Sequence, residues 1–225
     1  MTSTRGGKPL TVVGWGFAIF LIVVVVVFVG IRVTTDVPNI TGGVIPPEDD
    51  FDRRYAENPV LAYLHILPGM IYLIGAPFQV SMRFREGNLG RHRVLGRVVL
   101  ASGAITGVFA IVVGFVMPFG AVAESTASMV FGLYFLVALL LAYQAIRNGS
   151  ITVHRRWMIR AFAIGMAVGL IRIVIGTGEA IGIGIADSFG AAFWIAFVVM
   201  AFLAEFWLWL RPDPPIRRGV GDIVL

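Results

Sequence analysis

The sequence has no cysteine, only three histidines and few charged residues, and these shortages exclude several classes of protein. Without cysteine among its 225 residues, the chain forms no disulfides, thiolate metal sites or cysteine nucleophile. Charged residues make up 14% of the chain, against about a quarter in soluble globular domains. This is too little charge to cover a water-exposed surface, and 58% of the residues are hydrophobic. The composition therefore predicts an integral membrane protein.

The motifs of common soluble enzymes are also missing. The sequence contains no nucleotide-binding fingerprint, zinc-protease motif, nucleophile elbow or calcium loop. Its formal net charge is +5, but the basic residues occur in short clusters between apolar runs. That distribution is typical of contact with a membrane surface, including anionic lipids, and does not favour nucleic acid as a partner.

Six apolar runs are long enough to cross a bilayer, which takes about 20 helical residues. The predicted spans are 10–33, 59–82, 94–118, 126–147, 157–179 and 189–210. The first run is longer than the apolar part of a signal peptide, and no small-residue cleavage site follows it, so we expect it to be retained. The predicted fold is an all-α integral membrane protein with six transmembrane helices.

The spans divide the chain into simple parts. Residues 1–9 and 211–225 are predicted to be a cytoplasmic N-terminus and a cytoplasmic tail, and 34–58 an irregular outer loop. Residues 59–210 form a five-helix membrane domain. The length suits one compact bundle in the membrane.

Basic residues are distributed unequally between the two sides of the predicted bundle, and this predicts its orientation. Fourteen of the eighteen lysines and arginines lie on the side of the N-terminus: Arg5, Lys8, Arg83, Arg85, Arg91, Arg93, Arg97, Arg147, Arg155, Arg156, Arg160, Arg211, Arg217 and Arg218. The other side has Arg32, Arg53 and Arg54, which acidic residues outnumber. The positive-inside rule then places both termini in the cytoplasm, in a multi-pass protein of the inner cell membrane.

An internal repeat relates the hairpins 59–118 and 126–179. His92-Arg93 and His154-Arg155 occupy equivalent positions in the two hairpins. Each histidine is followed eleven residues later by a GxxxG motif, beginning at Gly103 and Gly165. An offset of eleven returns to nearly the same helix face. The parallel repeat predicts a four-helix core in which these glycines either allow close helix packing or make room for a flat ligand held by the two histidines.

Several motifs carry a resemblance to a family. The chain resembles DUF2306, a bacterial family of predicted membrane proteins, over about residues 59–208. The resemblance rests on Leu64-His65, Gln79, Arg83, His92-Arg93, Gly96-Arg97 and, most specifically, His154-Arg155-Arg156-Trp157-Met158-Ile159-Arg160. It implies a multi-helix membrane protein and no particular activity. The layout is also loosely similar to the cytochrome b561 bundle, which has two pairs of haem-binding histidines. Three histidines exclude two such haems and leave one compatible.

Polar residues inside the apolar runs are the candidate site residues, because ionisable groups are unfavourable at membrane depth. An inner cluster of His92, His154, Gln79, Gln144 and Glu205 is expected. Neutral imidazoles suit a haem iron or another metal. A histidine and an arginine at a helix N-terminus also suit the phosphate of an anionic lipid. The sequence is therefore compatible both with a metal or haem site and with a lipid-phosphate site at these histidines.

A second, outer polar cluster is predicted from helix phase. Arg172 shares a face with His154 and Gly165, and Glu179 continues that face. His65, which lies at a similar depth on another helix, shares its own face with Gly69, Tyr72 and Gln79. A buried structural pair, a proton site and a quinone headgroup site are all compatible with this cluster.

The leading hypothesis is a polytopic membrane protein whose core holds one b-type haem or a quinone for electron transfer. The alternatives are an accessory or assembly subunit of a larger membrane complex, and a small transporter with parallel repeats.

Overall fold

Long apolar helices make up most of the protein. The computed structural model describes residues 7–48, 50–80 and 88–211. All elements within these ranges are helices: α1 Gly7–Gly42, α2 Arg53–Glu57, α3 Pro59–Val80, α5 Leu89–Val116, α6 Ala121–Arg147, α7 Ile151–Ala180 and α8 Ile185–Leu210. Every one except the short α2 is long and apolar enough to cross a membrane. The prediction of an all-α membrane protein with six spanning helices is confirmed.

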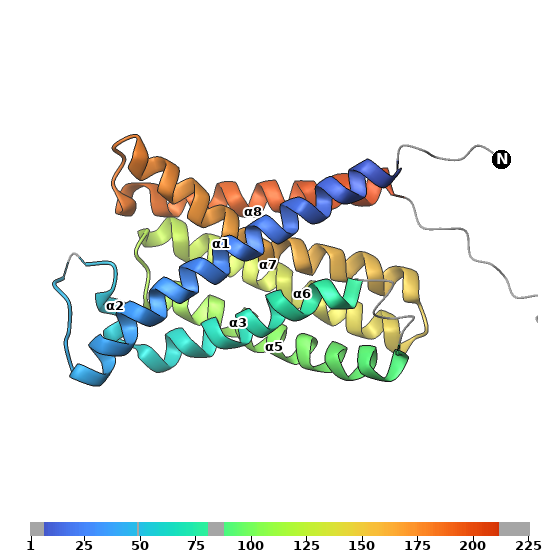
Figure 1. Ribbon diagram of the computed structural model, residues 1–225, viewed down its shortest axis with the longest axis horizontal. Coiled ribbons are helices and arrows are strands. Elements are labelled where there is room, and N and C mark those ends of the chain that lie inside the picture. Colours follow the sequence, from blue (N-terminus) through green and yellow to red (C-terminus); the bar gives the residue numbers. More distant parts are fainter. Residues whose placement is uncertain (1–6, 49, 81–87, 212–225) are drawn as a thin grey trace, which may run out of the picture.

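Four helices form the centre of the bundle. Helix α3 packs against α5, α5 against α6, α6 against α7, and α7 more loosely against α3. Among the described residues, α5 and α7 share no direct packing and lie on a diagonal of this ring. Helix α8 packs on α7 and α6, and α1 crosses the bundle obliquely over α7 and α3 (Figure 1). The loose α3–α7 side is therefore closed by α1.

Both ends of the described chain lie at one end of the bundle (Figure 1). The Arg211 side chain donates to the Thr11 hydroxyl, and the Trp207 ring packs against Gly14, so the start of α1 and the end of α8 are neighbours. The start of α5 and the turn from α6 to α7 lie at the same end. We call it the basic end, because it carries the exposed arginines Arg91, Arg93, Arg97, Arg147 and Arg155. The opposite end, where α2 lies, is called the α2 end.

Helix α1 is longer than the sequence predicts, since it continues to Gly42 instead of ending near residue 33. The hydroxyls of Thr34 and Thr35 donate to the Ile31 carbonyl, 2.7 and 3.2 Å away, and Arg32 pairs with Asp36 one turn later. These local bonds keep polar residues in helical conformation. The expectation of irregular structure throughout 34–58 is therefore wrong for the end of α1 and for α2.

Two helices begin earlier than their apolar runs. Helix α5 begins at Leu89, where the Asn88 side chain accepts from the Arg91 backbone N–H at 2.9 Å, and α7 begins at Ile151. The apolar runs begin at 94 and 157 and do not include the polar first turns, which are common where a helix emerges from the membrane. His92 and His154 lie inside the first turns of α5 and α7, as the sequence predicts.

Candidate binding cavity

A cavity of about 180 Å³ lies inside the α2 half of the bundle. All seven described helices contribute to its wall. Its aromatic residues are Phe28, Tyr55, Tyr72, Phe131, Phe135, Phe189, Phe193 and Phe197, and its polar residues are Arg32, Arg54, His65, Thr106, Glu124, Ser128 and Arg172. Most of the wall is apolar, with a few polar groups, which is the usual character of a small-molecule site.

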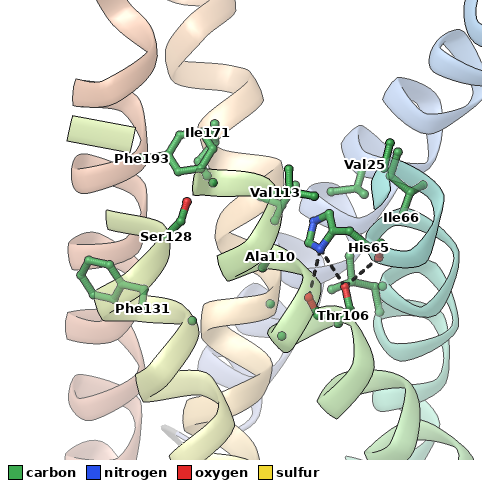
Figure 2. Close-up of a pocket in the computed structure, with 18 of the residues that line it drawn as sticks. Val25, His65, Ile66, Thr106, Ala110, Val113, Ser128, Phe131, Ile171 and Phe193 are labelled. Atoms are coloured by element: carbon green, nitrogen blue, oxygen red, sulfur yellow. Dashed lines mark hydrogen bonds between the residues drawn. The ribbon is translucent and has the colours of Figure 1, made fainter. Parts of the chain in front are cut away.

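His65 projects from α3 toward α5 (Figure 2). The Thr106 hydroxyl donates to the His65 backbone carbonyl at 2.7 Å, and His65 Nδ1 lies 3.0 Å from the Thr106 carbonyl oxygen and 3.1 Å from its hydroxyl. Since the hydroxyl proton is already used and a carbonyl only accepts, Nδ1 carries the proton. The lone pair is then on Nε2. Gly69 permits this contact, because a Cβ there would lie 2.9 Å from the Thr106 hydroxyl.

Arg32 is held by two carboxylates at the α2 end. It forms ion pairs with Asp36 on its own helix and with Asp52 just before α2. The Arg32 and Asp36 side chains are 5% and 1% exposed, and the Tyr63 hydroxyl donates to Asp36 at 3.1 Å. The Arg32 guanidinium also lies 3.9 Å from the centre of the Tyr55 ring. This network attaches α2 to α1.

Arg54 reaches the cavity from α2. Its Nη1 donates to the Met117 carbonyl at 3.1 Å, and its guanidinium lies 4.2 Å from the centre of the Phe51 ring and 4.3 Å from that of Phe119. Its Nε and Nη2 are buried and have no hydrogen-bond partner in the described structure. Burial lowers the pKa of the Arg54 guanidinium; Tyr55 and Glu124 act in the opposite direction, and the positive charges of Arg172 and Arg32 add to the lowering. The site therefore disfavours the charge that Arg54 carries.

Arg172 projects from α7 into the cavity, as its helix phase predicts. Its guanidinium lies 3.8 Å from the centre of the Phe28 ring, a favourable cation–π distance. The Tyr55 hydroxyl is a hydrogen-bond partner of the guanidinium, and Arg32 and Glu124 are close enough to act on its charge. However, its Nε is buried without a hydrogen-bond partner, and the described residues include no ion pair to Arg172. Helix phase predicts that Arg172 faces the interior and bonds to His65, Glu179 or an equivalent buried acceptor. The inward orientation is confirmed. Among the described residues the hydrogen-bond partner is Tyr55, and no bond to His65 or Glu179 occurs.

Glu124 is the carboxylate on the cavity wall, and it is committed to the backbone. It is 5% exposed, and its Oε2 accepts from the backbone N–H groups of Phe119 and Gly120 at 2.6 and 2.7 Å. These bonds fix the turn that leads into α6, where the helix dipole also favours a negative charge. Glu124 therefore offsets part of the positive charge in the cavity without forming a described ion pair with Arg54 or Arg172.

The two repeat glycines meet one aromatic ring. A Cβ on Gly103 of α5 would lie 2.8 Å from Tyr72 Cδ2, and a Cβ on Gly165 of α7 would lie 2.8 Å from Tyr72 Cε1. The Tyr72 ring on α3 therefore fills the space between the two glycines, and Tyr72 is 1% exposed. The expectation that α5 and α7 pack together through these glycines is wrong, because the side chain of a third helix separates them.

The second glycines of the two motifs have different partners. Gly107 faces Leu136 and Phe135 of α6, and Gly169 faces the backbone of Leu21 on α1. The repeated pattern therefore makes contacts with three different helices, α3, α6 and α1, although it looks equivalent in sequence. Small residues at membrane helix crossings allow such close backbone approach.

The predicted inner cluster lies apart from the cavity, toward the basic end. His154 Nδ1 donates to the Ala142 carbonyl of α6 at 2.8 Å, which links the two helices of its own hairpin. Gln79 packs against Gly96 of α5, and its buried Nε2 has no partner among the described residues. His92 is half-buried, and Gln144 is exposed. None of the four lines the cavity.

Two predicted members of the buried clusters are at the surface. Glu179, near the end of α7, is exposed, whereas the neighbouring Gly178 is buried and faces Ser188 of α8. The Glu205 side chain is 52% exposed and pairs with Arg160 through two hydrogen bonds of 2.6 and 2.9 Å. The expectation that these two residues belong to a buried cluster is therefore wrong. His65 and Arg172 do share one cavity.

Sequence reasoning missed several groups on or beside the cavity wall. Arg54 and Asp36 were treated as charges of an outer loop, and Glu124 fell just before the predicted span that begins at 126. An acidic residue within the first turn of an apolar helix was the available signal for Glu124. No local pattern indicated that α2 delivers Arg54 into the bundle.

Comparison with known proteins gives one match. The sequence profile of DUF2306, described as a predicted membrane protein, matches residues 62–208. No curated protein and no solved structure matches the chain. The matched region begins in α3 and ends in α8, so it includes the four-helix ring and most of the cavity wall.

Proposed function

The chain belongs to the DUF2306 family of predicted membrane proteins, and from this premise we propose that it is a membrane-embedded binding protein for a small ligand. The ligand has an apolar body of about one ring and a head that accepts hydrogen bonds. It occupies the cavity beside His65 and Arg172. Arg172 carries the proposal, because a charge inside an apolar bundle is costly unless it is compensated or has a function. Its described contacts, the Tyr55 hydroxyl and the Phe28 ring, bring no negative charge, and it has no ion pair among the described residues.

The size of the cavity limits the ligand. Its volume of about 180 Å³ is close to that of engineered apolar cavities of about 150 Å³ that bind benzene. Aromatic side chains such as Phe131, Phe193 and Phe197 suit a flat ring. A quinone headgroup meets these limits, with its carbonyl oxygens as acceptors, and so do other one-ring compounds with an accepting head.

A b-type haem does not fit the residues proposed for it. The space expected between Gly103 and Gly165 contains the Tyr72 ring. His92 and His154 do not line the cavity, and a one-ring cavity does not accommodate a macrocycle of four pyrrole rings. We therefore derive no haem chemistry for this chain. Electron transfer therefore remains part of the proposal only if the ligand in the cavity is a quinone.

The binding function is tested by filling the cavity. Ala110 lines the wall on α5, and leucine at this position removes volume from the cavity. We expect one-ring probes to bind the parent protein in detergent and to lose binding in Ala110→Leu. The probes are 4-fluorobenzoate, 4-fluorobenzamide and tetramethyl-1,4-benzoquinone, the first two followed by fluorine NMR relaxation and the third by displacement of the second.

Ala104→Leu is the matched control, because Ala104 is on the same helix but is exposed on its outer face. It should bind the probes like the parent. If no probe binds the parent above the level of empty micelles, the binding function is wrong, and the accessory-subunit alternative is favoured.

We also propose that the basic end is cytoplasmic, so that both termini are inside the cell and the α2 end is outside. The support is the predominance of arginine at one end, where these side chains reach the headgroups of anionic lipids. Reporters fused after Leu225 and within 87–90 should then report a cytoplasmic position, and a reporter within 40–50 an external one. A cytoplasmic signal from 40–50 would reverse the orientation.

A further inference from the structure

We infer that the ligand carries an acid group, such as a carboxylate, which Arg172 binds directly while Arg54 adds a second positive charge from α2. This inference rests on the proposed binding function and specifies the head of the ligand. It distinguishes an anionic ligand from neutral acceptors of the same size, including quinones.

The charges on the cavity wall favour an anion. Among the described residues, three arginines, Arg32, Arg54 and Arg172, line the cavity together with one carboxylate, that of Glu124. Asp36 and Asp52 balance Arg32 from outside the wall, since neither lines the cavity. Within the wall, Arg54 and Arg172 therefore share one carboxylate. An added negative charge compensates the excess at a place with little water to screen it.

The hydrogen-bonding groups favour the same ligand. The guanidinium Nε of Arg172 and the Nε and Nη2 of Arg54 are donors with no partner among the described residues. Glu124 does not act as their acceptor among the described residues, since its Oε2 accepts from two backbone N–H groups and it forms no described hydrogen bond or ion pair with Arg54 or Arg172. A carboxylate accepts several hydrogen bonds and matches the planar guanidinium in shape, whereas a quinone carbonyl carries no charge to compensate arginine.

The geometry also orients the ligand. Arg54 belongs to α2, and the Arg32–Asp52 pair holds the start of that helix against α1. The acid group therefore faces the α2 end, and the ring lies deeper, toward Phe131 and the bonded pair His65–Thr106 (Figure 2). Because His65 Nδ1 already donates to Thr106, its Nε2 offers only a lone pair. This repels a second carboxylate and favours a ligand with one acidic end.

The parent protein alone gives the decisive comparison. The probes 4-fluorobenzoate and 4-fluorobenzamide have the same ring and nearly the same shape, but only the first is charged at pH 7. After subtraction of binding to empty micelles, we expect the benzoate to bind at least about tenfold more tightly, which is the scale of one hydrogen bond to a charged group. Equal or tighter binding of the benzamide or of tetramethyl-1,4-benzoquinone would overturn the acid-group inference and leave the binding function standing. Absence of binding by all three would remove both.

Variants of the two arginines then test which of them binds the acid group. Arg172→Gln should weaken benzoate binding at least about tenfold and change benzamide binding by less than about threefold, because only the charged head depends on the guanidinium. Arg54→Gln should have a smaller effect in the same direction. Arg53→Gln is the control, since Arg53 is the next residue along α2 but pairs with Glu57 and does not line the cavity. If Arg172→Gln leaves the preference for benzoate intact, Arg172 does not bind the acid group. Retained benzamide binding verifies that each variant is folded.

Discussion

Replacing Arg32 with methionine is expected to lower the free energy of unfolding by about 3–5 kcal/mol, the usual effect of removing one partner of a buried ion pair. The Asp36 carboxylate, 1% exposed, would then remain buried with the Tyr63 hydroxyl as its described partner. Asp52 would also lose its contact, and with it the bond that holds the start of α2 against α1. Reversible unfolding in detergent or bicelles, followed by circular dichroism, measures the loss.

Arg53→Met is the matched control for this prediction. Arg53 forms an ion pair of the same kind with Glu57, but the two side chains are 32% and 39% exposed, and exposed pairs contribute about 0–1 kcal/mol. The double variant Arg32→Met/Asp36→Leu should recover much of the stability, because it removes the buried carboxylate together with its counterion. A loss below about 1 kcal/mol in Arg32→Met would show that Asp36 is not left as a buried charge.

Replacing Gly165 with leucine is expected to destabilise the protein by about 3 kcal/mol, at the upper end of the usual range for overpacking. Even the Cβ would lie 2.8 Å from Tyr72 Cε1. The Tyr72 ring also contacts Gly103 at its other edge and packs against Phe135 with ring centres 5.2 Å apart, so it can make room only by giving up these contacts. The shift in unfolding temperature, together with the unfolding free energy, measures the effect.

Gly176→Leu is the control, since Gly176 lies on the same helix and a Cβ there meets no atom within 4 Å. It should leave stability within about 0.5 kcal/mol of the parent or raise it slightly, because glycine is a poor helix former. If Tyr72 is the obstacle, Tyr72→Ala combined with Gly165→Leu should cost less than the sum of the two single changes. Additive losses would mean that the leucine meets another neighbour.

The two predictions concern residues on two sides of the same cavity. Tyr72 lines the cavity between α5 and α7. At the α2 end, the Arg32 network holds α2, which carries Arg54, against α1. A ligand bound between them would add contacts to both. Stability of the two groups of variants, measured with and without 4-fluorobenzoate, therefore links the packing of the bundle to its proposed function.

The sequence by itself determined the number of spans, the placement of the start of α1 and the end of α8 at one end of the bundle, and the inward face of Arg172. These features depend on the length of apolar runs, on the distribution of arginine and on helix phase, and all three are local properties of the chain. The sequence also singled out Gly103 and Gly165 as positions of close approach, and the family resemblance carried by the His154–Arg160 motif is confirmed by the match over 62–208.

Only the tertiary structure decided which groups meet. Helix phase predicted that Gly103 and Gly165 face the core, but it could not show that both contact Tyr72, because that depends on how far α3 enters the ring. Likewise, Arg54 belongs to a short segment without apolar periodicity, and its place in the cavity follows from the Arg32–Asp52 pair and from its bond to Met117, 63 residues away in sequence. The partners of a buried side chain are set by packing between segments that are distant in sequence. The residues around that side chain in the sequence therefore do not indicate which partners it will have.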